Sequence, residues 1–280
     1  MQEHVITPRR GLFDIDIKGL WYYRDLYLMY IRRDIVIQYK QTILGPLWYI
    51  IQPLLTTIIY MFVFGGLAGI STDGIPQPLF YLSGILLWNY FSDCFISCSE
   101  VFTENANVFG KVYFPRLIVP LSAVTSNLLK LGIQFVLFLV VYSYYIICGP
   151  SDVICISYST LFILPLLILQ TGLLALAGGL IFSSLTTKYR DLKFLLSFGI
   201  QLLMFGTPVI YPLSAAPGEY ADIIRLNPLT PIFETFKSII LGTGFIDWGG
   251  FIYSSLFVFV TLILGILIFS RTERDFMDTV

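Results

Sequence analysis

Six long runs of apolar residues dominate the pattern of hydrophobic and polar positions along the chain. The hydrocarbon core of a bilayer is about 30 Å thick, and a helix needs about 20 apolar residues to cross it. The pattern therefore predicts six membrane-spanning helices in an all-α integral membrane protein. The predicted spans are Leu47–Leu67, Leu79–Cys98, Leu117–Ile147, Leu161–Leu185, Phe194–Ile210 and Gly250–Phe269.

The first predicted span begins at a sharp change from charged to apolar sequence. The charged residues of the N-terminal segment end at Lys40, and the apolar run follows within a few positions. Gly45-Pro46 breaks the helix at this border, because proline has no N–H and disfavours a helical residue before it. Trp48 and Tyr49 come next, and both residue types are typical of a membrane interface.

The segment Lys18–Lys40 predicts an amphipathic helix that precedes this border. At 100° per residue, five charged residues fall within an arc of about 100°. They are Lys18, Asp25, Arg32, Arg33 and Lys40. Much of the remainder is apolar or aromatic, although Arg24 and Asp34 break the pattern. Such a helix is expected to lie in the membrane surface. Docking on a soluble domain is the alternative, and the two roles are compatible.

The basic residues are distributed unequally between the two sides of the predicted bundle. Fourteen of the seventeen Lys and Arg residues lie before the first span, in the second–third and fourth–fifth loops, or in the tail. The opposite loops contain only Arg225 and Lys237, and Lys130 lies within a span. Because positive residues favour the cytoplasmic side, both termini are predicted to be cytoplasmic. The predicted divisions are a cytoplasmic segment 1–46, a transmembrane domain 47–270 and a cytoplasmic tail 271–280.

The longest segment on the opposite side, Tyr211–Trp248, is not an ordinary polar loop. It contains a short apolar face that begins after Asn227-Pro228 and ends at Gly242, and this face is too short to cross a bilayer. It predicts short re-entrant or interfacial helices between the fifth and sixth spans, since irregular backbone at that depth needs protein or water around it. A structural cap and a gate are equally compatible with the pattern.

Composition agrees with a membrane protein. The chain is 56% hydrophobic and 12% charged, with a mean hydropathy of +0.80, whereas soluble domains carry roughly 25% charged residues. The net charge of −1 argues against a nucleic-acid partner. Cys94 and Cys98 lie in an apolar run and are interpreted as packing residues. Cys148 and Cys155 flank one short loop, where a disulfide is one possibility.

The sequence shows no catalytic set and no cofactor or metal motif. It has no P-loop, GxSxG, HExxH or CxxC motif, and His4 is its single histidine. Uphill transport by this chain would therefore take its energy from a gradient or from another chain. Gly178-Gly179 lies within a span and favours close helix packing.

Three charged residues lie in or next to predicted spans, where charges are costly and often functional. They are Asp93, Glu100 and Lys130, and Asn127 lies on the same helical face as Lys130. Lys130 could line a polar pathway, contact an anionic substrate, or pair with Asp93 or Glu100. Aromatic residues make up 16% of the chain. Most are expected in interfaces and lipid-facing packing, but Tyr and Trp rings can also stack on sugars.

The loop between the second and third spans, 100–116, carries apolar residues on the predicted cytoplasmic side. Apolar residues in such a place need a partner or the membrane surface. A short helix that docks into a groove of another protein would use them. The next cytoplasmic loop, Lys188–Lys193, is compact and basic.

Five motifs in one order resemble the membrane subunits of ATP-binding-cassette exporters for cell-surface polysaccharides, namely O-antigen, capsule and teichoic acid. They are RRDIVIQYKQTILGPLWYIIQPL at 32–54, ENANVFGKVYFPR at 104–116, KYRDLKFLL at 188–196, TPVIYP at 207–212 and NPLTPIFETFKSIILG at 227–242. The resemblance covers the chain from Arg32 almost to its end. The chain departs from it at Lys130, where the resemblance leads one to expect an acidic residue.

The resemblance implies a homodimer in the cytoplasmic (inner) membrane that works with a separate nucleotide-binding ATPase subunit, which would hold ATP and Mg. The substrate would be a glycan on a lipid carrier. The implied ATPase-coupling residues are Glu104, Asn105, Val108, Phe109, Lys111, Phe114 and Arg116. The implied outer-gate residues are Pro228, Phe233 and Phe236, and the intramembrane polar candidates are Asp93, Asn127 and Lys130.

Three alternatives stay open at this stage. The first is an exporter of the same kind for small amphipathic molecules such as drugs. The second is an ion-coupled carrier, which the absence of an inverted repeat disfavours. The third is a membrane-embedded enzyme, which would need clustered Asp, Glu or His near one interface.

Overall fold

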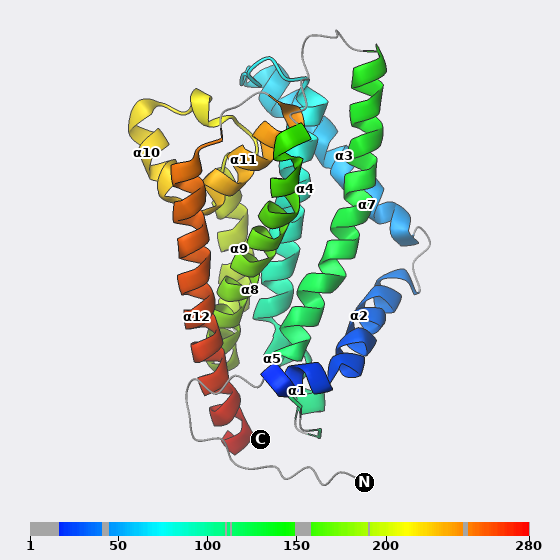
Figure 1. The fold of residues 1–280 in the computed structure, drawn as a ribbon, viewed down its shortest axis with the longest axis vertical. Coiled ribbons are helices and arrows are strands. Elements are labelled where there is room, and N and C mark those ends of the chain that lie inside the picture. Colours follow the sequence, from blue (N-terminus) through cyan, green and yellow to red (C-terminus); the bar gives the residue numbers. More distant parts are fainter. Residues whose placement is uncertain are drawn as a thin grey trace.

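The computed structural model describes residues 17–40, 45–109, 111–112, 114–148, 158–189, 191–242 and 246–279. Within these ranges the chain is helical and has no β-strand, so the predicted all-α class is confirmed (Figure 1). The α-helices are α1 (Ile17–Tyr22), α2 (Arg24–Tyr39), α3 (Trp48–Tyr60), α4 (Gln77–Ser99), α5 (Val101–Glu104), α6 (Ala106–Phe109), α7 (Ile118–Cys148), α8 (Leu164–Lys188), α9 (Leu192–Phe205), α10 (Gly218–Leu226), α11 (Leu229–Leu241) and α12 (Trp248–Thr279). Met61–Leu67 continues α3 as a π-helix.

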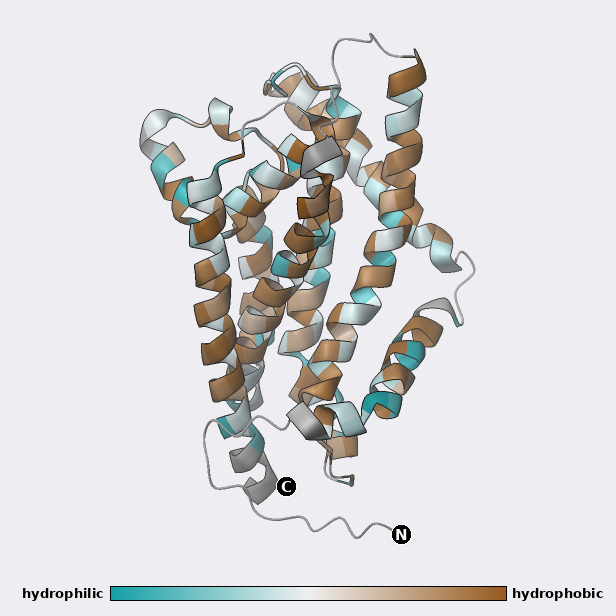
Figure 2. Cartoon of the chain, viewed as in Figure 1, coloured by the Kyte–Doolittle hydropathy of each residue, from teal (hydrophilic) through white to brown (hydrophobic). Residues whose placement is uncertain are grey.

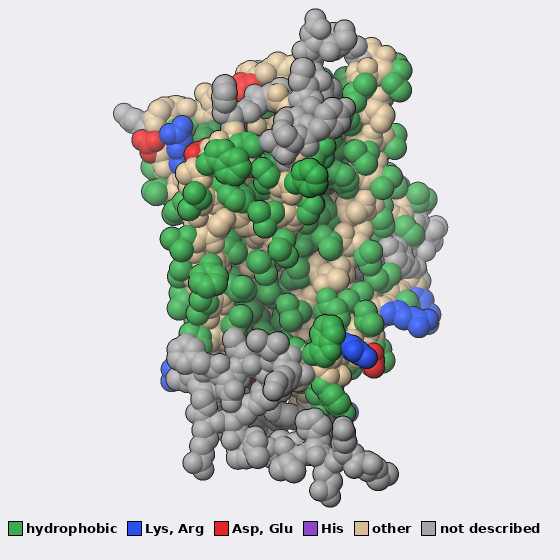
Figure 3. All heavy atoms as spheres, in the orientation of Figure 1, with side chains coloured by type: hydrophobic (Ala, Val, Ile, Leu, Met, Phe, Trp, Pro, Cys, Tyr) green, Lys and Arg blue, Asp and Glu red, His purple; other side chains and the backbone are tan. Residues whose placement is uncertain are grey.

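Among the described residues, five helical segments are long and apolar enough to cross a membrane. They are Gly45–Leu67, Gln77–Ser99, Ile118–Cys148, Leu161–Lys188 and Trp248–Glu273. These segments coincide with five of the six predicted spans. Figure 2 shows that hydrophobic residues dominate them. On the face drawn in Figure 3, the described charged side chains lie toward the two ends, with hydrophobic side chains between them.

The fifth predicted span, Phe194–Ile210, corresponds to the shorter helix α9. Its 14 residues are about 21 Å long, against a bilayer core of about 30 Å. The helix ends because Pro208 disfavours helical geometry at the residue before it. The amide of Asn227 then donates to the carbonyl of Gly206 over 3.0 Å, which satisfies a carbonyl at the helix end. The fifth span, and with it the total of six, stays a prediction.

Helix α4 lies at the centre of the bundle. Every residue from Leu79 to Trp88 is buried, and the helix packs along both α7 and α8. A Cβ atom added at Gly178 or Gly179 of α8 would collide with Phe95 or Cys98 of α4. The prediction that these glycines allow close helix packing is therefore confirmed.

The cysteines are divided between the core and the surface. Cys94 and Cys98 are buried, in agreement with their predicted packing role, while Cys148 is exposed at the end of α7. Cys155 lies outside the described residues, so a disulfide between it and Cys148 is not tested.

The predicted amphipathic segment forms α1 and α2, which are separated at Tyr23. One face packs on α7, where the hydroxyl groups of Tyr27 and Thr125 are hydrogen-bonded over 2.5 Å. The charged residues Asp25, Arg32, Arg33 and Lys40 are exposed. Apolar side chains such as Trp21, Leu28, Met29 and Ile37 are exposed as well. The protein therefore buries only part of the apolar surface of these helices.

The close contact between α8 and α12 can be tested at Gly265. A Cβ atom at this position would lie 2.7 Å from the carbonyl oxygen of Ala177, whereas nothing lies within 4 Å of the corresponding position at Gly132. We expect Gly265→Ala to lower the free energy of unfolding by about 1–3 kcal/mol through overpacking. The matched Gly132→Ala variant should be neutral or stabilised by about 0.5–1 kcal/mol. Thermal unfolding in detergent measures both, and equal behaviour would contradict the close contact.

Candidate functional site

Polar side chains lie along a seam between α4 and α7. Asp93 of α4 and Lys130 of α7 form an ion pair, and the Lys130 ammonium lies 5.2 Å from the centre of the Tyr49 ring. Of the roles left open for Lys130, the structure shows the pairing with Asp93. The side chains of Lys130 and Asp93 are 19% and 32% exposed. The pair is therefore accessible from the surface of the bundle.

The seam leads to a pocket of about 240 Å³ where α2, α4, α5 and α7 meet. Its polar lining residues include Arg33, Asp34, Ser97, Asn105, Ser126 and Asn127. Ser97 lies one helical turn from Asp93 on α4, and Asn127 lies one turn from Lys130 on α7. The ion pair and the pocket thus share one face of each helix, and together we name them the polar stripe. All three predicted intramembrane polar residues belong to it.

Arg33 connects the surface helix α2 to the residues after α4. Its guanidinium donates to Asp34 over 2.8 Å and to the side-chain oxygen of Asn105 over 3.3 Å. It also lies 4.4 Å from the centre of the Tyr30 ring, within the range of a cation–π contact. The amide of Asn105 donates to the carbonyl of Val101 over 3.1 Å. The predicted coupling residue Asn105 is therefore buried and faces the polar pocket.

Three other predicted coupling residues are buried within the chain. Phe109, Phe114 and Arg116 are at most 3% exposed. The two rings lie 5.7 Å apart, and the Arg116 guanidinium lies 5.1 Å from the Phe109 ring. Arg116 also donates to the backbone carbonyl of Glu273 in α12 over 3.2 Å. These side chains therefore hold the loop against the end of the bundle.

The remaining predicted coupling residues are exposed, and one of them, Glu104, also lines the polar pocket. Glu104, Val108 and Lys111 are exposed, and so is the neighbouring Val112. The exposed fractions of Val108 and Val112 are 37% and 58%. We name these four residues the exposed loop face. Gly110 and Tyr113 of the same loop lie outside the described residues.

The loop is also connected to the beginning of α9. The Lys193 ammonium lies 2.8 Å from a carboxylate oxygen of Glu100. Glu100 therefore pairs with Lys193, while Lys130 pairs with Asp93. This contact brings together the two loops that the basic residues predict to lie on the cytoplasmic side.

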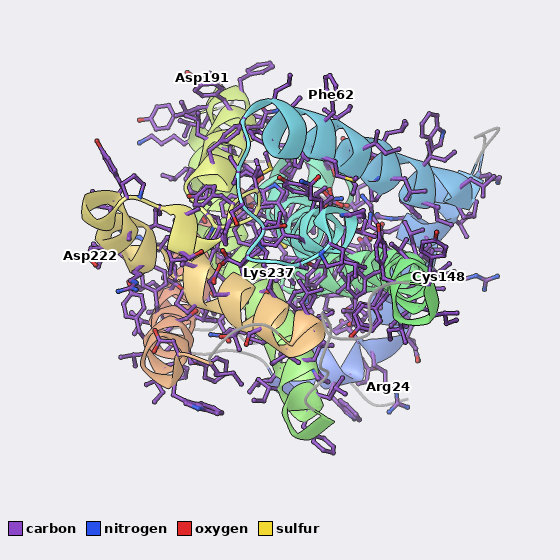
Figure 4. All side chains as sticks on the ribbon, turned by 90° about the horizontal axis from the view of Figure 1, so that it is seen from above. Arg24, Phe62, Cys148, Asp191, Asp222 and Lys237 are labelled. Atoms are coloured by element: carbon purple, nitrogen blue, oxygen red, sulfur yellow. The ribbon has the colours of Figure 1, made fainter. Side chains whose placement is uncertain are left out.

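The predicted outer-gate residues belong to a packed layer at the opposite end of the bundle. Helix α11 crosses this end when the molecule is seen from above (Figure 4). Phe233 and Phe236 are at most 1% exposed, and the Phe233 ring lies 6.3 Å from Trp88 of α4. The carbonyl of Pro228 accepts a hydrogen bond from Ser254 of α12 over 2.7 Å. Their burial favours the structural cap over a gate lined by these rings.

A buried lysine anchors this layer, and sequence analysis missed it by counting it only as a basic residue of an outer loop. Lys237 of α11 is 5% exposed and lies near the centre of the bundle in Figure 4. Its ammonium donates to the carbonyls of Pro208 and Val209 over 2.6 and 3.2 Å and lies 3.8 Å from the Phe80 ring. The signal available in the sequence was one lysine within the apolar face of a short helix.

The surroundings of Lys237 disfavour its charged form. Burial lowers the pKa of Lys237 to about 7, and the carboxylates of Glu234 and Asp73 partly oppose this shift. Burial also raises the pKa of Glu234. Helix α11 is not among the candidate spans, so these groups belong to the end of the bundle.

The Asp93–Lys130 pair predicts a non-additive mutational effect. Asp93→Asn or Lys130→Met alone leaves a partly buried charge without its partner, which should cost about 1–3 kcal/mol of unfolding free energy. The double variant removes both charges and should be closer to the parent than the sum of the single variants. Thermal unfolding of the four proteins measures this coupling. Additive effects would contradict an energetically important pair.

Lys237 predicts a pH dependence of stability. Between about pH 7 and pH 10 the unfolded chain keeps the proton on this lysine while the folded chain loses it, so stability should rise with pH in this window. Lys237→Met should abolish that part of the rise. Unfolding temperatures at pH 7 and pH 9 test this, with the exposed Lys188→Met as the matched control. Parallel pH profiles for the parent and Lys237→Met would contradict it.

A family model and several proteins of known name align with most of this chain. A family model described as ABC-2 type transporter matches residues 26–241. The O-antigen export system permease protein RfbA of Klebsiella pneumoniae is 27% identical over 262 residues, which cover 93% of this chain and 96% of that protein. The protein of the same name from Myxococcus xanthus is 27% identical over 226 residues, 80% of this chain and 83% of the relative. The polysialic acid transport protein KpsM of Escherichia coli is 24% identical over 252 residues, 88% of this chain and 93% of the relative.

The matched region runs from α2 to the end of α11 and so contains the polar stripe, the exposed loop face and the layer around α11. It covers well over half of the chain. The chain belongs to the ABC-2 type transporter family.

Proposed function

We propose that the chain is the membrane subunit of an exporter that moves a lipid-linked polysaccharide, of the O-antigen, capsule or teichoic-acid type, across the cytoplasmic membrane. The observation that carries the proposal is similarity over 93% of the chain to a relative named an O-antigen export permease. The sequence has no P-loop. ATP and Mg are therefore assigned to a separate nucleotide-binding subunit, and this chain has no enzymatic activity of its own.

The substrate path is proposed to form between two copies of the chain. Helix α4 occupies the centre of one copy with its side chains buried, which leaves no room for a polymer through the middle of a single bundle. The polar stripe supports a role in this path, because its serine, asparagine and charged side chains can exchange hydrogen bonds with sugar hydroxyls. Tyr49, beside Lys130, adds an aromatic face on which a sugar ring can stack.

The exposed loop face is proposed to contact the ATPase subunit. Val108 and Val112 supply its apolar part, and Glu104 and Lys111 supply charge. The buried residues behind this surface would transmit the motion. Arg116 connects the loop to α12, and Glu100 connects it to α9. A displacement of the loop would therefore act on two helices at once.

The membrane orientation completes the proposal. Six spans place the loop 100–116 and both termini in the cytoplasm, as the distribution of basic residues predicts. Helix α9 would form the fifth span together with the turns after Phe205. Because α9 is shorter than the bilayer core, the membrane would be thinned at this span or the end of the helix would be covered by the outer layer. Helices α10 and α11 would form the re-entrant region, with α11 as a packed cap. The surface helices α1 and α2 would face membrane lipids.

The proposed docking surface predicts the effect of charge at Val108 and Val112. The double variant Val108→Asp/Val112→Asp should weaken binding of the ATPase subunit by about tenfold or more, since an unpaired carboxylate at an interface loses its hydration. Surface polysaccharide should fall in parallel. Co-purification of the ATPase with the tagged permease measures binding.

The isosteric double variant Val108→Thr/Val112→Thr is the control, because it keeps the shape of the surface without adding charge. Both variants should unfold at the parental temperature, since neither side chain is buried. If the aspartate variant co-purifies with the ATPase and exports polysaccharide normally, the exposed loop face does not contact the ATPase subunit.

The proposed orientation predicts which cysteines react from each side. In a Cys155→Ser background, Cys148 should react with a membrane-impermeant maleimide in intact spheroplasts, because it is exposed at the end of α7. A Val112→Cys variant should gain a second labelled cysteine only after the membrane is permeabilised. If the maleimide labels Val112→Cys in intact spheroplasts and does not label Cys148, the proposed orientation is wrong.

A further inference from the structure

An apolar groove of about 700 Å³ lies between the α1–α2 pair and the beginning of α7. Its apolar walls include Leu20 and Leu28 on the surface helices and Ile118 and Leu121 on α7. Leu28 is 60% exposed, so the groove is open to the surroundings of the protein. The volume falls within the roughly 300–1,000 Å³ typical of sites for small ligands. Neither the polar stripe nor the loop contacts use this groove.

Arg24 supplies positive charge to the same groove. Among the described residues that line it, Arg24 is the only charged one. Its guanidinium lies 5.9 Å from the centre of the Trp21 ring, which also lines the groove. Figure 4 shows Arg24 at the periphery of the molecule. The groove therefore combines a long apolar wall with a cation at its edge.

The positive charge is available to an external group. Asp25 lies 4.0 Å from Arg24, but its side chain is 93% exposed, and such a pair in water contributes little. An arginine guanidinium presents several donors that match the oxygens of a phosphate. A phosphate group at Arg24 would therefore gain hydrogen bonds without breaking a strong internal pair.

The position of the groove identifies the kind of occupant. Ile118 and Leu121 belong to the first turns of a helix that is long and apolar enough to cross a membrane, so the groove lies at one end of a candidate span. Trp21 is 73% exposed, as expected for a tryptophan at a membrane interface. At this depth the molecules in the surroundings are phospholipids, whose phosphate lies at the interface and whose chains extend into the apolar layer.

We propose that the groove between α1–α2 and α7 binds one anionic phospholipid, with an acyl chain along Leu28 and Leu121 and the phosphate at Arg24. The bound lipid covers apolar surface that the protein leaves open and fixes α1–α2 against α7. Since α2 also carries Arg33, which contacts Asn105, the lipid stabilises the position of the helix that borders the polar pocket. The site requires neither ATP nor the glycan, so its test is independent of the proposed function.

The test measures phosphatidylglycerol and phosphatidylcholine bound to the purified chain by native mass spectrometry from mixed micelles. One phosphatidylglycerol should be retained in preference to phosphatidylcholine. Arg24→Gln should weaken phosphatidylglycerol binding about fivefold, as expected for one basic residue near an anionic lipid, and should leave phosphatidylcholine binding unchanged. Leu121→Trp fills the groove and should reduce binding of both lipids.

Arg32→Gln is the matched control, because Arg32 is an exposed arginine of the same helix that does not line the groove. It should change phosphatidylglycerol binding less than twofold. Equal losses in Arg24→Gln and Arg32→Gln would show diffuse attraction to the helix and overturn the site, as would no loss in either. Lipid binding is compared among variants that unfold at the parental temperature. Where a variant unfolds at a lower temperature, a photo-crosslinking residue at position 28 identifies the occupant of the groove instead.

The crosslink also separates the competing occupants. A phosphatidylglycerol adduct supports the proposal, whereas an adduct to another segment of the same chain overturns it. Displacement of phosphatidylglycerol by a polyprenyl phosphate at lower concentration would assign the groove to the lipid carrier and would also overturn it.

Discussion

The close packing of α4 against α8 is the contact on which the rest of the bundle depends. Gly178 and Gly179 leave no space for side chains at this contact, and α4 is consequently buried along most of its length. Because the centre of the bundle is filled, the Asp93–Lys130 pair and the polar pocket lie at its margin. The polar stripe follows the seam between α4 and α7, and the buried loop residues close the end of the same seam. A path for a polar polymer is therefore proposed at the surface of the bundle, between two copies of the chain.

At each end of the bundle, polar backbone groups lie next to an apolar core and need hydrogen-bond partners. A different basic side chain supplies them at each end. At the loop end, Arg116 is buried against aromatic rings and donates to a carbonyl of α12. At the other end, Lys237 donates to carbonyls just beyond α9. In both places one long basic side chain joins elements distant in sequence. Each end should therefore move as a unit with the helices it joins, which suits a transporter that converts motion at the loop into motion of whole spans.

Hydropathy predicted five of the spans because apolar runs of bilayer length carry that information locally. It placed the end of the fifth span beyond Pro208, which is a local helix-ending signal, and it did not reveal that Asn227 and Lys237, more than 20 residues away, satisfy the carbonyls after α9. Composition identified the loop 100–116 but not which of its apolar residues face outward. Phe109 is buried because it packs on Phe102, whose ring stacks on Phe269 of α12, a helix far from the loop in sequence. Val112 makes no such contact among the described residues and is exposed. The sequence also left the partner of Lys130 open, because Asp93 is 37 positions away.

The claim that this chain carries a lipid-linked glycan across the membrane is tested most directly in cells that lack it. The measurement is the amount of surface polysaccharide together with the amount of lipid-linked glycan on the cytoplasmic side, with and without the chain restored on a plasmid. Cells without the chain should lose the surface polymer and accumulate its lipid-linked form inside, and the restored chain should reverse both changes. Normal surface polysaccharide in cells that lack the chain, or its loss without internal accumulation, would show that the chain does not export this glycan.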